Sequence, residues 1–406
     1  MKRRDFLGCS AFASLAIPGL CHGIRTMSQT THGDQHTPAA TTLFVAGDVM
    51  TGRGIDQILP HPGDPRIDEP YSQSALDYVR LAERANGSIP RPADFAYIWG
   101  DALAALEQAA PDVRIINLET AVTARGAPWA GKGIQYRMHP LNIPCLTAAR
   151  IDCCVLANNH LLDWGYAGLD DTLASLARAG LRIAGAGSSQ RAAQAPAELP
   201  LAKGGRVLVF ACGVHSSGIP AAWAATAKRA GVNLLTDLSE TTVNAIADTV
   251  RATKRSGDLV VISIHWGGNW GYTIPASHIR FAHALIDKAG VDLIHGHSSH
   301  HPIGIEVYRD RPILYGCGDL IDDYEGIGGH GQFRSNLTLL YLVTLDRSNG
   351  TLLSLTMVPM RMQRFRLNRA TPEEADWLAK VLNRESQRFG ATVQLAEDGR
   401  LHLGWQ

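Results

Sequence analysis

Short apolar runs that end in polar residues of the metal-ligand type recur through this chain of 406 residues. Five of these runs read as buried strands, because each is short and mostly apolar. The five are residues 42–46, 113–116, 151–156, 259–264 and 291–294. Helical patterns lie between them, and this alternation of strand and helix predicts an α/β protein.

The remaining elements are expected to follow the same pattern, with antiparallel strands added toward the C-terminus. Helices are expected over residues 74–84, 101–109, 167–179, 240–254, 277–289 and 372–389. Further strands are expected over residues 181–184, 206–211, 303–308, 313–315, 337–345 and 352–357. Residues 60–92 read as a long excursion from the sheet that serves as a lid or a substrate rim.

The fifth apolar run leads into four histidines within seven residues, His295, His297, His300 and His301. Histidine is the commonest metal ligand, and Gly296 would let the backbone come close to an ion. The alternative interpretation is a solvated polar loop, or histidines that cap a helix.

Four other strand ends carry candidate ligands, and ligands of α/β sheets gather at the carboxyl ends of strands. These candidates are Asp48, Asn117 with Glu119, Asn159 with His160, and His265. Carboxylate, amide and imidazole groups together suit Mn²⁺, Fe²⁺ or Zn²⁺. We therefore expect one or two divalent ions, and a pair about 3.5–4 Å apart would clamp a phosphoryl group and activate water.

Charge and cysteine content exclude other classes of protein. The chain has 38 basic and 38 acidic residues, so its net charge of zero argues against a nucleic-acid partner. Five cysteines beyond residue 40, with no framework spacing, argue against a disulfide scaffold and predict buried, inert thiols.

The N-terminus reads as a targeting segment. Residues 2–7 (Lys-Arg-Arg-Asp-Phe-Leu) form a twin-arginine pattern, followed by an apolar stretch that is short for a membrane span. We expect a signal over residues 1–23 and a flexible linker over residues 24–40. The protein is then exported by the twin-arginine route to the periplasm or cell surface, or stays tethered to the membrane through an uncleaved signal.

The strand-end residues form an ordered set of motifs over residues 42–360. The motifs are Gly47-Asp48-Val49-Met50, Asn117-Leu118-Glu119, Ala157-Asn158-Asn159-His160 with Asp163 and Gly165, His265-Trp266-Gly267, Gly296-His297 with His300, and Gly304-Ile305-Glu306 with Tyr308. This set resembles the CapA capsule-synthesis proteins, which are linked to poly-γ-glutamate production and lie within the calcineurin-like metallophosphoesterase superfamily.

The resemblance implies a fold and a domain organisation. It implies a four-layer α/β/β/α sandwich of the metallophosphoesterase type, with two central mixed sheets. We expect this domain over residues 41–362, with residues 363–406 as a C-terminal helical tail packed on it.

The resemblance also implies a role for each motif residue. Asp48 would bind the first metal, and Glu119 would take the place of the bridging carboxylate. The second metal would be bound by Asn159 and His265, and both shells would be completed by His297 and His300. His160 would contact the substrate or protonate the leaving group.

This chain departs from the superfamily pattern at several positions. Met50 stands where phosphoesterases usually place a ligand histidine, which puts the first metal in doubt. The residues after Gly296 leave either His300 or His301 as the second ligand of that loop. Asp319 reads either as a further ligand or as a turn residue, and Asn117 is a further candidate.

Lys132, Tyr136 and Arg137 lie in one polar loop and form either an anion-binding rim for substrate or a solvated loop. The resemblance points to an anionic polymer, or a small phosphate-containing substrate, and to membrane-bound polymer synthase components as partners. The leading hypothesis is a metal-dependent hydrolase that acts on such a polymer. The alternatives are a non-catalytic, metal-stabilised protein that binds or assembles the polymer, and a nucleotide phosphoesterase.

Overall fold

The computed structural model describes residues 40–406. The expected signal segment and all but the last residue of the expected linker lie outside this range. Within it, the core consists of a ten-stranded and a seven-stranded sheet.

The ten-stranded sheet is mixed. Its central strands, β1 (Ala40–Val49), β4 (Val113–Leu118), β7 (Cys153–Val155) and β8 (Arg182–Ala184), run parallel. On the other side of β1 the chain adds antiparallel strands, in the order β19 (Leu337–Asp346), β20 (Leu352–Met362), β23 (Leu401–Trp405) and β22 (Ala391–Leu395). Two short strands complete it, β18 (Asp319–Ile321) beside β1 and β21 (Leu367–Arg369) beside β20.

The seven-stranded sheet is also mixed, and all its strands come from the middle of the chain. Its order is β10 (Ala197–Pro200), β11 (Arg206–Val214), β14 (Leu259–His265), β15 (Leu293–His297), β17 (Arg311–Leu314) and β16 (Ile305–Tyr308), with β13 (Leu234–Leu235) beside β11. Strands β11, β14, β15 and β17 run parallel, so their carboxyl ends lie at one edge.

Alternating side chains of the central strands divide the core into layers, because successive residues of a strand point to opposite faces. Leu43 and Val45 of β1 pack in the cluster that also holds Val209 of β11, so these faces of the two sheets meet. Phe44 of β1 packs in a second cluster and Phe210 of β11 in a third, on the outer faces. Both faces of these strands are buried, which explains their continuous apolar sequence.

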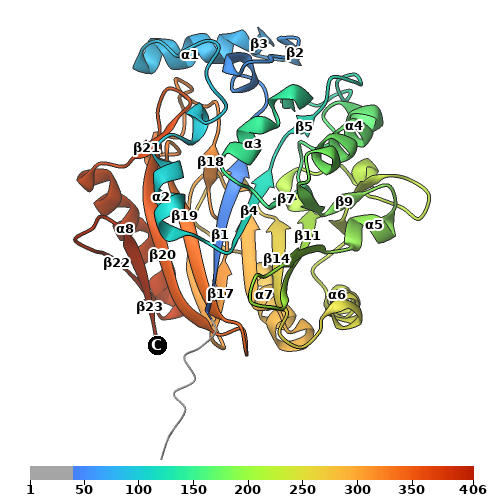
Figure 1. Cartoon of the computed structure of the whole chain (residues 1–406), viewed down its shortest axis with the longest axis vertical. Coiled ribbons are helices and arrows are strands. Elements are labelled where there is room, and N and C mark those ends of the chain that lie inside the picture. Colours follow the sequence, from blue (N-terminus) through green and yellow to red (C-terminus); the bar gives the residue numbers. More distant parts are fainter. Residues whose placement is uncertain (1–39) are drawn as a thin grey trace, which may run out of the picture. The chain divides into compact units, whose positions relative to one another are not determined.

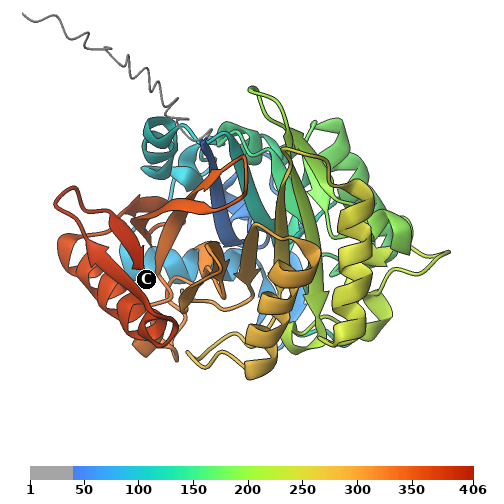
Figure 2. The same cartoon turned by 90° about the horizontal axis from the view of Figure 1, so that it is seen from below.

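Helices cover both outer faces (Figures 1 and 2). Buried residues of α2 (Ala102–Ala109), α3 (Pro144–Ala148) and α4 (Gly165–Arg178) share a cluster with Phe44. Those of α6 (Glu240–Thr253) and α7 (Ala276–Ala289) share a cluster with Phe210. The order helix, sheet, sheet, helix confirms the predicted four-layer α/β/β/α sandwich with two mixed sheets.

The expected strands and helices described above all occur, with shifts of a few residues at their ends. Residues 363–406 differ more, because they contain β21, β22 and β23 as well as the expected helix, α8 (Pro372–Ser386). The alternation was present in the sequence, since Leu401 and Leu403 are buried while His402 between them is exposed. The tail is therefore a helix followed by a hairpin that extends the larger sheet.

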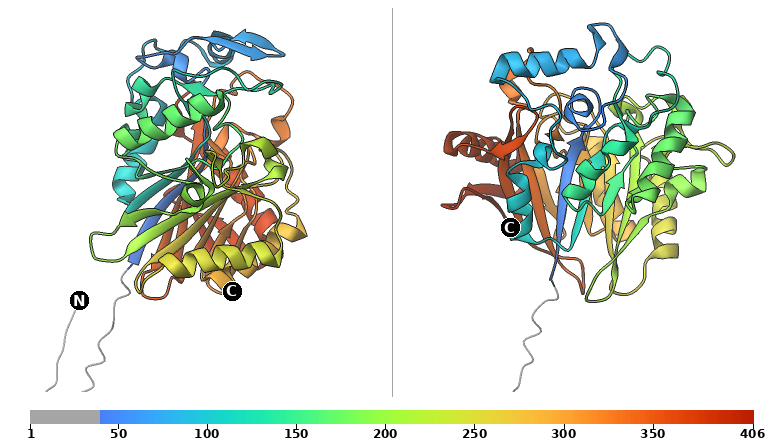
Figure 3. Two further views of the ribbon diagram at one scale, coloured as in Figure 1. Left: turned by 90° about the vertical axis from the view of Figure 1, so that its right-hand side faces the viewer. Right: turned by 45° about the horizontal axis from the view of Figure 1, so that its top comes forward.

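The excursion after β1 contains more structure than the single helix expected. It holds a hairpin, β2 (Arg66–Glu69) with β3 (Ser72–Ser74), and the helix α1 (Leu76–Asn86). Figures 1 and 3 show this blue segment at the end of the structure to which β1 runs. The minor elements are β5 (Ala121–Val122), β6 (Arg137–Met138), β9 (Ala186–Gly187), β12 (Gly231–Val232) and α5 (Gln190–Gln194).

Two further observations concern the described residues. Their five cysteines are free and buried, as the sequence predicted. None of the helices between residues 40 and 406 combines the length and apolarity of a membrane span.

Candidate metal centre

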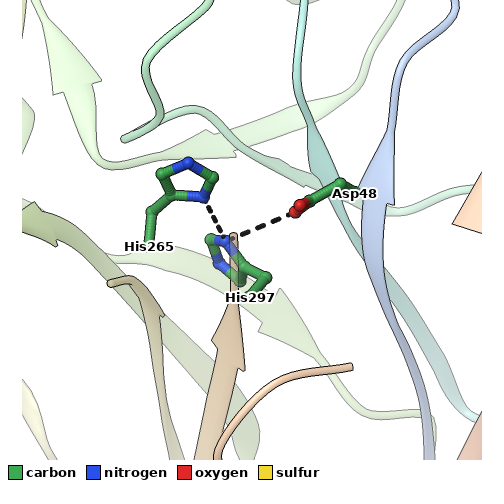
Figure 4. A group of neighbouring side chains, drawn as sticks. All are labelled: Asp48, His265 and His297. Atoms are coloured by element: carbon green, nitrogen blue, oxygen red, sulfur yellow. Dashed lines mark hydrogen bonds and ion pairs between the residues drawn. The ribbon is translucent and has the colours of Figure 1, made fainter. Parts of the chain in front are cut away.

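The carboxyl ends of strands from both sheets bring the predicted ligands together. Asp48 is near the end of β1, His265 ends β14 and His297 ends β15. Figure 4 shows their side chains pointing toward one another, with interactions from His297 to each of the other two. Segments more than 200 residues apart in the sequence therefore converge on one point, as the strand-end pattern predicted.

Two groups of possible metal ligands occur among the described residues, and Asp48 belongs to both. The first consists of Asp48, His265 and His297, and the second of Asp48, His300 and Asp319. Within each group one ligand atom per residue lies within 4.8 Å of the others, and every member is buried. The first group contains two imidazoles, whereas the second contains two carboxylates.

Glycines before Asp48 and His297 allow tight packing of strands at this point. A β-carbon on Gly47 would lie 1.9 Å from the carbonyl oxygen of Gly318, and one on Gly296 would lie 2.5 Å from that of Tyr315. Gly296 lies within β15, where the missing β-carbon lets the neighbouring backbone come close. Its expected approach to an ion stays a prediction.

The loop after β15 adopts an unfavourable backbone conformation that fixes Asp48. Ser298 has φ of +96°, a region in which residues with a β-carbon are uncommon. Its N–H donates a hydrogen bond to Asp48 Oδ2 at 3.2 Å. Such strain persists where the surroundings impose it, and it often marks a functional site.

A buried chain of hydrogen bonds fixes the tautomer of His297. His295 Nε2 donates to the carbonyl oxygen of Ala46 at 2.8 Å, so its Nδ1 accepts from the hydroxyl of Ser263 at 3.1 Å. That hydroxyl in turn accepts from His297 Nε2 at 2.8 Å. His297 Nδ1 is therefore left as a lone pair facing Asp48, which is the form that binds a metal.

Amide side chains hold the carboxylates in place. Asn117 Nδ2 donates to Asp48 Oδ1 at 2.7 Å and to Glu119 Oε2 at 3.2 Å. The oxygen of Asn117 accepts from Asn158 Nδ2 at 3.0 Å. Asn117 thus orients both carboxylates with its nitrogen, and its oxygen is already occupied, so it is not placed as a ligand.

The charges of the site fit a cation. Burial, followed by repulsion from Asp319, raises the pKa of Asp48 to about 7. Burial also raises the pKa of Glu119 and of Asp319 well above their ordinary values. Asp319 Oδ2 is buried and has no hydrogen-bond partner among residues 40–406. Grouped, buried carboxylates with an unpartnered oxygen are the surroundings that a divalent cation stabilises.

The histidines of the site are neutral, as metal ligands must be. Burial lowers the pKa of His265 and of His297 well below the ordinary value, and it lowers that of His300 as well. Carboxylate and imidazole donors are also the set that suits Mn²⁺, Fe²⁺ or Zn²⁺. The residues present therefore fit a divalent ion, although their individual roles as ligands remain predictions.

Glu119 and Asn159 lie on the side of His265 away from His297. Asn159 Oδ1 is 2.9 Å from His265 Nε2, and Glu119 Oε1 is 3.9 Å from the same nitrogen. The carboxylate that both ligand groups share is Asp48, whereas the sequence predicted a bridging position for Glu119. The pKa of Glu119 is nevertheless raised partly by Asp48 and Asp319, so its charge acts on the same centre.

His160 is held beside this centre by two groups. Its Nδ1 is 2.6 Å from Asp163 Oδ2 and 2.9 Å from Lys132 Nζ, and Lys132 pairs with the same carboxylate at 2.6 Å. The shorter contact, to the carboxylate, favours a proton on Nδ1, which leaves Nε2 free, 3.8 Å from Glu119 Oε1. Burial and the nearby Lys132 lower the pKa of His160 to about 4, so the ring is neutral near pH 7.

Three of the weaker candidates do not join the ligand groups, although the ring of Tyr136 packs on that of His160, with centroids 4.8 Å apart. The nitrogens of His301 contact the carbonyl of Pro302 and the N–H of Gly271, so His300 and not His301 joins the ligand groups. Tyr136 is fully buried, and its hydroxyl bonds to Arg53 at 2.6 Å and not to solvent. The Arg137 guanidinium stacks 3.6 Å over Trp164.

Lys132 is the member of the predicted anion-binding loop that reaches the site. It lines a small cavity of about 260 Å³ together with Glu119, Asn159, His160 and His300. Its ammonium is already paired with Asp163, at 2.6 Å. The loop thus contributes one residue to the site, and the other two stabilise the fold around it.

Several residues shape the site through contacts that the sequence pattern did not predict. Ser263 and His295 support His297 from within two adjacent strands, where alternate residues share a face. Arg53 holds the Asp323 carboxylate through Nε at 2.8 Å and Nη2 at 2.5 Å. The acidic run Asp322-Asp323-Tyr324-Glu325, which begins three residues after Asp319, was the sequence signal that could have indicated these contacts.

Comparison with known proteins identifies the family. The family described as "Bacterial capsule synthesis protein PGA_cap" matches residues 42–324. The chain belongs to this PGA_cap family. Its match includes Asp48, Glu119, Asn159, His265 and His297, and the resemblance to CapA proteins is confirmed.

Two relatives agree with this assignment in sequence. A "Probable polyglutamine synthesis accessory protein" of Mycobacterium tuberculosis is 52% identical over 367 residues, which cover 90% of this chain and 96% of the relative. The "PGA biosynthesis protein CapA" of Bacillus subtilis is 26% identical over 281 residues, 68% of this chain and 62% of that one. A solved structure described as a novel phosphatase, from Mycoplasma pneumoniae, is 10% identical, with a TM-score of 0.44 over 81% of this chain and 96% of that one.

Proposed function

We propose that this PGA_cap protein is an exported, divalent-metal-dependent hydrolase that acts in the biosynthesis or processing of an anionic surface polymer such as poly-γ-glutamate. The observation that carries the proposal is the pair of buried ligand groups that share Asp48. The names of the relatives support the polymer, since they refer to polyglutamine synthesis and to PGA biosynthesis.

The proposed site for hydrolysis combines the ligand groups with His160. A divalent ion held there supplies Lewis-acid activation of a water molecule and of the bond to be cleaved. His160, neutral and with Nε2 free, is placed to accept a proton or a hydrogen bond in the small cavity. Asp163 orients the ring by accepting the Nδ1 proton. The bond cleaved is a phosphoester or an amide.

We also propose where the protein acts and which partners it has. The twin-arginine pattern at residues 2–7 supports export by that route to the periplasm or cell surface. The partners implied are the polymer itself and membrane-bound components of its synthase. Fractionation of cells, with Arg3 and Arg4 replaced by lysine, tests the route, because a twin-arginine substrate is retained in the cytoplasm when both arginines are lost.

A metal titration combined with an assay tests the proposal. Purified protein is titrated with Mn²⁺ or Zn²⁺ and then assayed on γ-linked glutamate oligomers and on a generic phosphodiester. We expect metal-dependent turnover of one of these substrates, abolished in Asp48→Ala and retained in His283→Ala. His283 is the matched control, because it pairs with Glu306 at 2.8 Å and lies outside both ligand groups.

One observation favours a second function, a non-catalytic protein that holds the polymer during assembly. Met50 stands where a ligand histidine is usual, and it is fully buried with the hydroxyl of Tyr324 3.6 Å from its sulfur. The second ligand group therefore lacks that imidazole. One weakly held ion, with polymer binding but no turnover, is the result that this function predicts.

A further inference from the structure

A cavity of about 1050 Å³ adjoins the candidate metal centre. It shares Ile134, Asn269, His300 and Tyr324 with the smaller cavity that holds Glu119 and His160. Because these residues line both spaces, a substrate bound in the large cavity can contact His300, a member of the second group of metal ligands. The large cavity is therefore placed to hold the part of a substrate that extends from the reacting bond.

Three segments form its walls. The excursion after β1 contributes Tyr71 and Tyr78, the loop after β14 contributes Trp270, and a glycine-rich loop contributes residues 326–328, 330 and 331. Tyr71 and Ile327 lie on this lining and are exposed, at 87% and 48%. The Tyr78 ring already has the Arg53 guanidinium 3.5 Å from its centroid, and Trp270 stacks on His330 at 3.9 Å. Tyr71 is an exposed ring whose face can attract a further cation.

The arginines that line the cavity are already neutralised. Arg53 is fully enclosed by Asp323, at 2.5 Å, and Glu69, at 3.3 Å. Arg334 pairs with Glu374 at 3.4 Å and lies over the ring of Trp377. Within residues 40–406 the lining therefore offers no uncommitted arginine or lysine to a carboxylate of a ligand.

Two carboxylates of the lining are, by contrast, not paired with a cation. Asp322 is 3% exposed, and its Oδ2 has no hydrogen-bond partner in the described part of the chain. Glu325 accepts only from neutral groups, Asn86 Nδ2 at 2.7 Å and the N–H of Phe365 at 2.6 Å. Burial, followed by repulsion from Asp319, raises the pKa of Asp322 well above its ordinary value, and a bound cation would stabilise the ionised form. The cavity thus offers two carboxyl groups without a cation partner among the described residues, which suits a cation better than a polyanion.

We infer that this cavity binds an ammonium group of the substrate, with Asp322 and Glu325 as its counter-charges. The inference rests on the proposed function where it names the polymer. A γ-linked glutamate chain carries a carboxylate on every residue and an ammonium only at its amino terminus. The cavity would then recognise the amino-terminal end of the polymer, and the metal centre would act on a bond near that end.

Binding measured by calorimetry tests this inference in the metal-loaded protein. The probes are γ-linked triglutamate with a free amino terminus, the same trimer N-acetylated, and the diamine cadaverine. We expect acetylation to weaken binding about 10-fold, and Asp322→Asn or Glu325→Gln to remove most of this preference. Asp322→Asn keeps the oxygen that accepts from the N–H of Tyr324, so it preserves the local fold.

Asp77→Asn is the matched control, because Asp77 lines the same cavity but pairs with Arg80 and Ser72. The Asp77→Asn variant should keep the preference for the free amine.

Equal binding of both trimers overturns the inference and leaves the polymer proposal intact. Cadaverine binding that depends on Asp322, without binding of either trimer, supports the cavity and contradicts the polymer. Loss of metal in Asp322→Asn would place this residue in the metal shell and overturn its assignment here.

Discussion

The two ligand groups around Asp48 differ in how firmly their side chains are held. In the first group, His297 is oriented through Ser263 and His295 by a backbone carbonyl, and His265 contacts Asn159. In the second group, His300 Nδ1 bonds to Asp319 Oδ1 at 2.9 Å, and the other oxygen of Asp319 is unpartnered among the described residues. The side chains of the first group are therefore preorganised, whereas Asp319 of the second group is held through one oxygen only.

Met50 stands where a ligand histidine is usual, and Asp319 offers the second group an additional carboxylate. Preorganised ligands bind a metal more tightly, because less ordering occurs on binding. The first group should hold the tighter ion, and the second, which has Met50 nearby and an additional carboxylate, the weaker one. Asp319 pairs in register with Asp48 across β1 and β18, so two adjacent strands present the carboxylates side by side.

Asp48→Ala should have the largest effect, because both groups lose their shared ligand. We expect metal affinity to fall by more than about 100-fold at both positions, beyond the loss typical of outer-shell changes. Calorimetric titration with Mn²⁺ or Zn²⁺ measures this, with His283→Ala as the control. Unchanged affinity in Asp48→Ala would remove the basis for a shared ligand.

Single histidine variants should separate the two groups. His297→Ala should weaken the tighter ion by about 100-fold and spare the weaker one, while His300→Ala should do the reverse. Competition with a chelating dye resolves the two affinities. If both variants lose the same ion, the two groups act as one site.

Ser263→Ala tests the chain that fixes the tautomer of His297. Its hydroxyl touches no predicted metal position, yet its loss should weaken the tighter ion by about 10–100-fold, since outer partners orient the ligand. Ser354→Ala, at an exposed position of β20, is the matched control. An affinity equal to that of the unchanged protein would show that His297 is held by other contacts.

The pH dependence of metal binding should report Asp48. Its pKa of about 7 in the metal-free protein lies above the value of 3.8 expected when unfolded, so its ionisation destabilises the metal-free fold as pH rises from 4 to 7. Metal binds the ionised form, and the pKa of His265 and His297 is already low. We therefore expect affinity to fall up to about tenfold per pH unit below 7. A metal-induced rise in Tm that is larger at pH 8 than at pH 6 checks the sign.

His160→Ala should have the smallest effect on metal content. His160 belongs to neither ligand group, and its Nδ1 is held by Asp163. We expect the metal to be retained within about twofold and turnover to be lost, since general acid–base groups contribute about 10²–10⁴-fold. Elemental analysis alongside the assay distinguishes this result from misfolding.

The sequence predicted most of this architecture, because the central strands are buried on both faces and read as continuous apolar runs. It also predicted which strand ends meet, since parallel strands align their carboxyl ends. The sequence could not show which of the adjacent His300 and His301 joins the ligand groups. That depends on the path of the loop after β15, in which Ser298 has a positive φ. The burial of Tyr136 was equally hidden, since its partners Arg53 and Asp323 are distant in sequence.

Anomalous diffraction from crystals grown with Mn²⁺ shows whether both ligand groups around Asp48 hold an ion. We expect a strong peak bounded by Asp48, His265 and His297, and a weaker peak bounded by Asp48, His300 and Asp319. Both peaks should disappear from crystals of Asp48→Ala. Density for the ion elsewhere, or none beside Asp48 at saturating Mn²⁺, would contradict it.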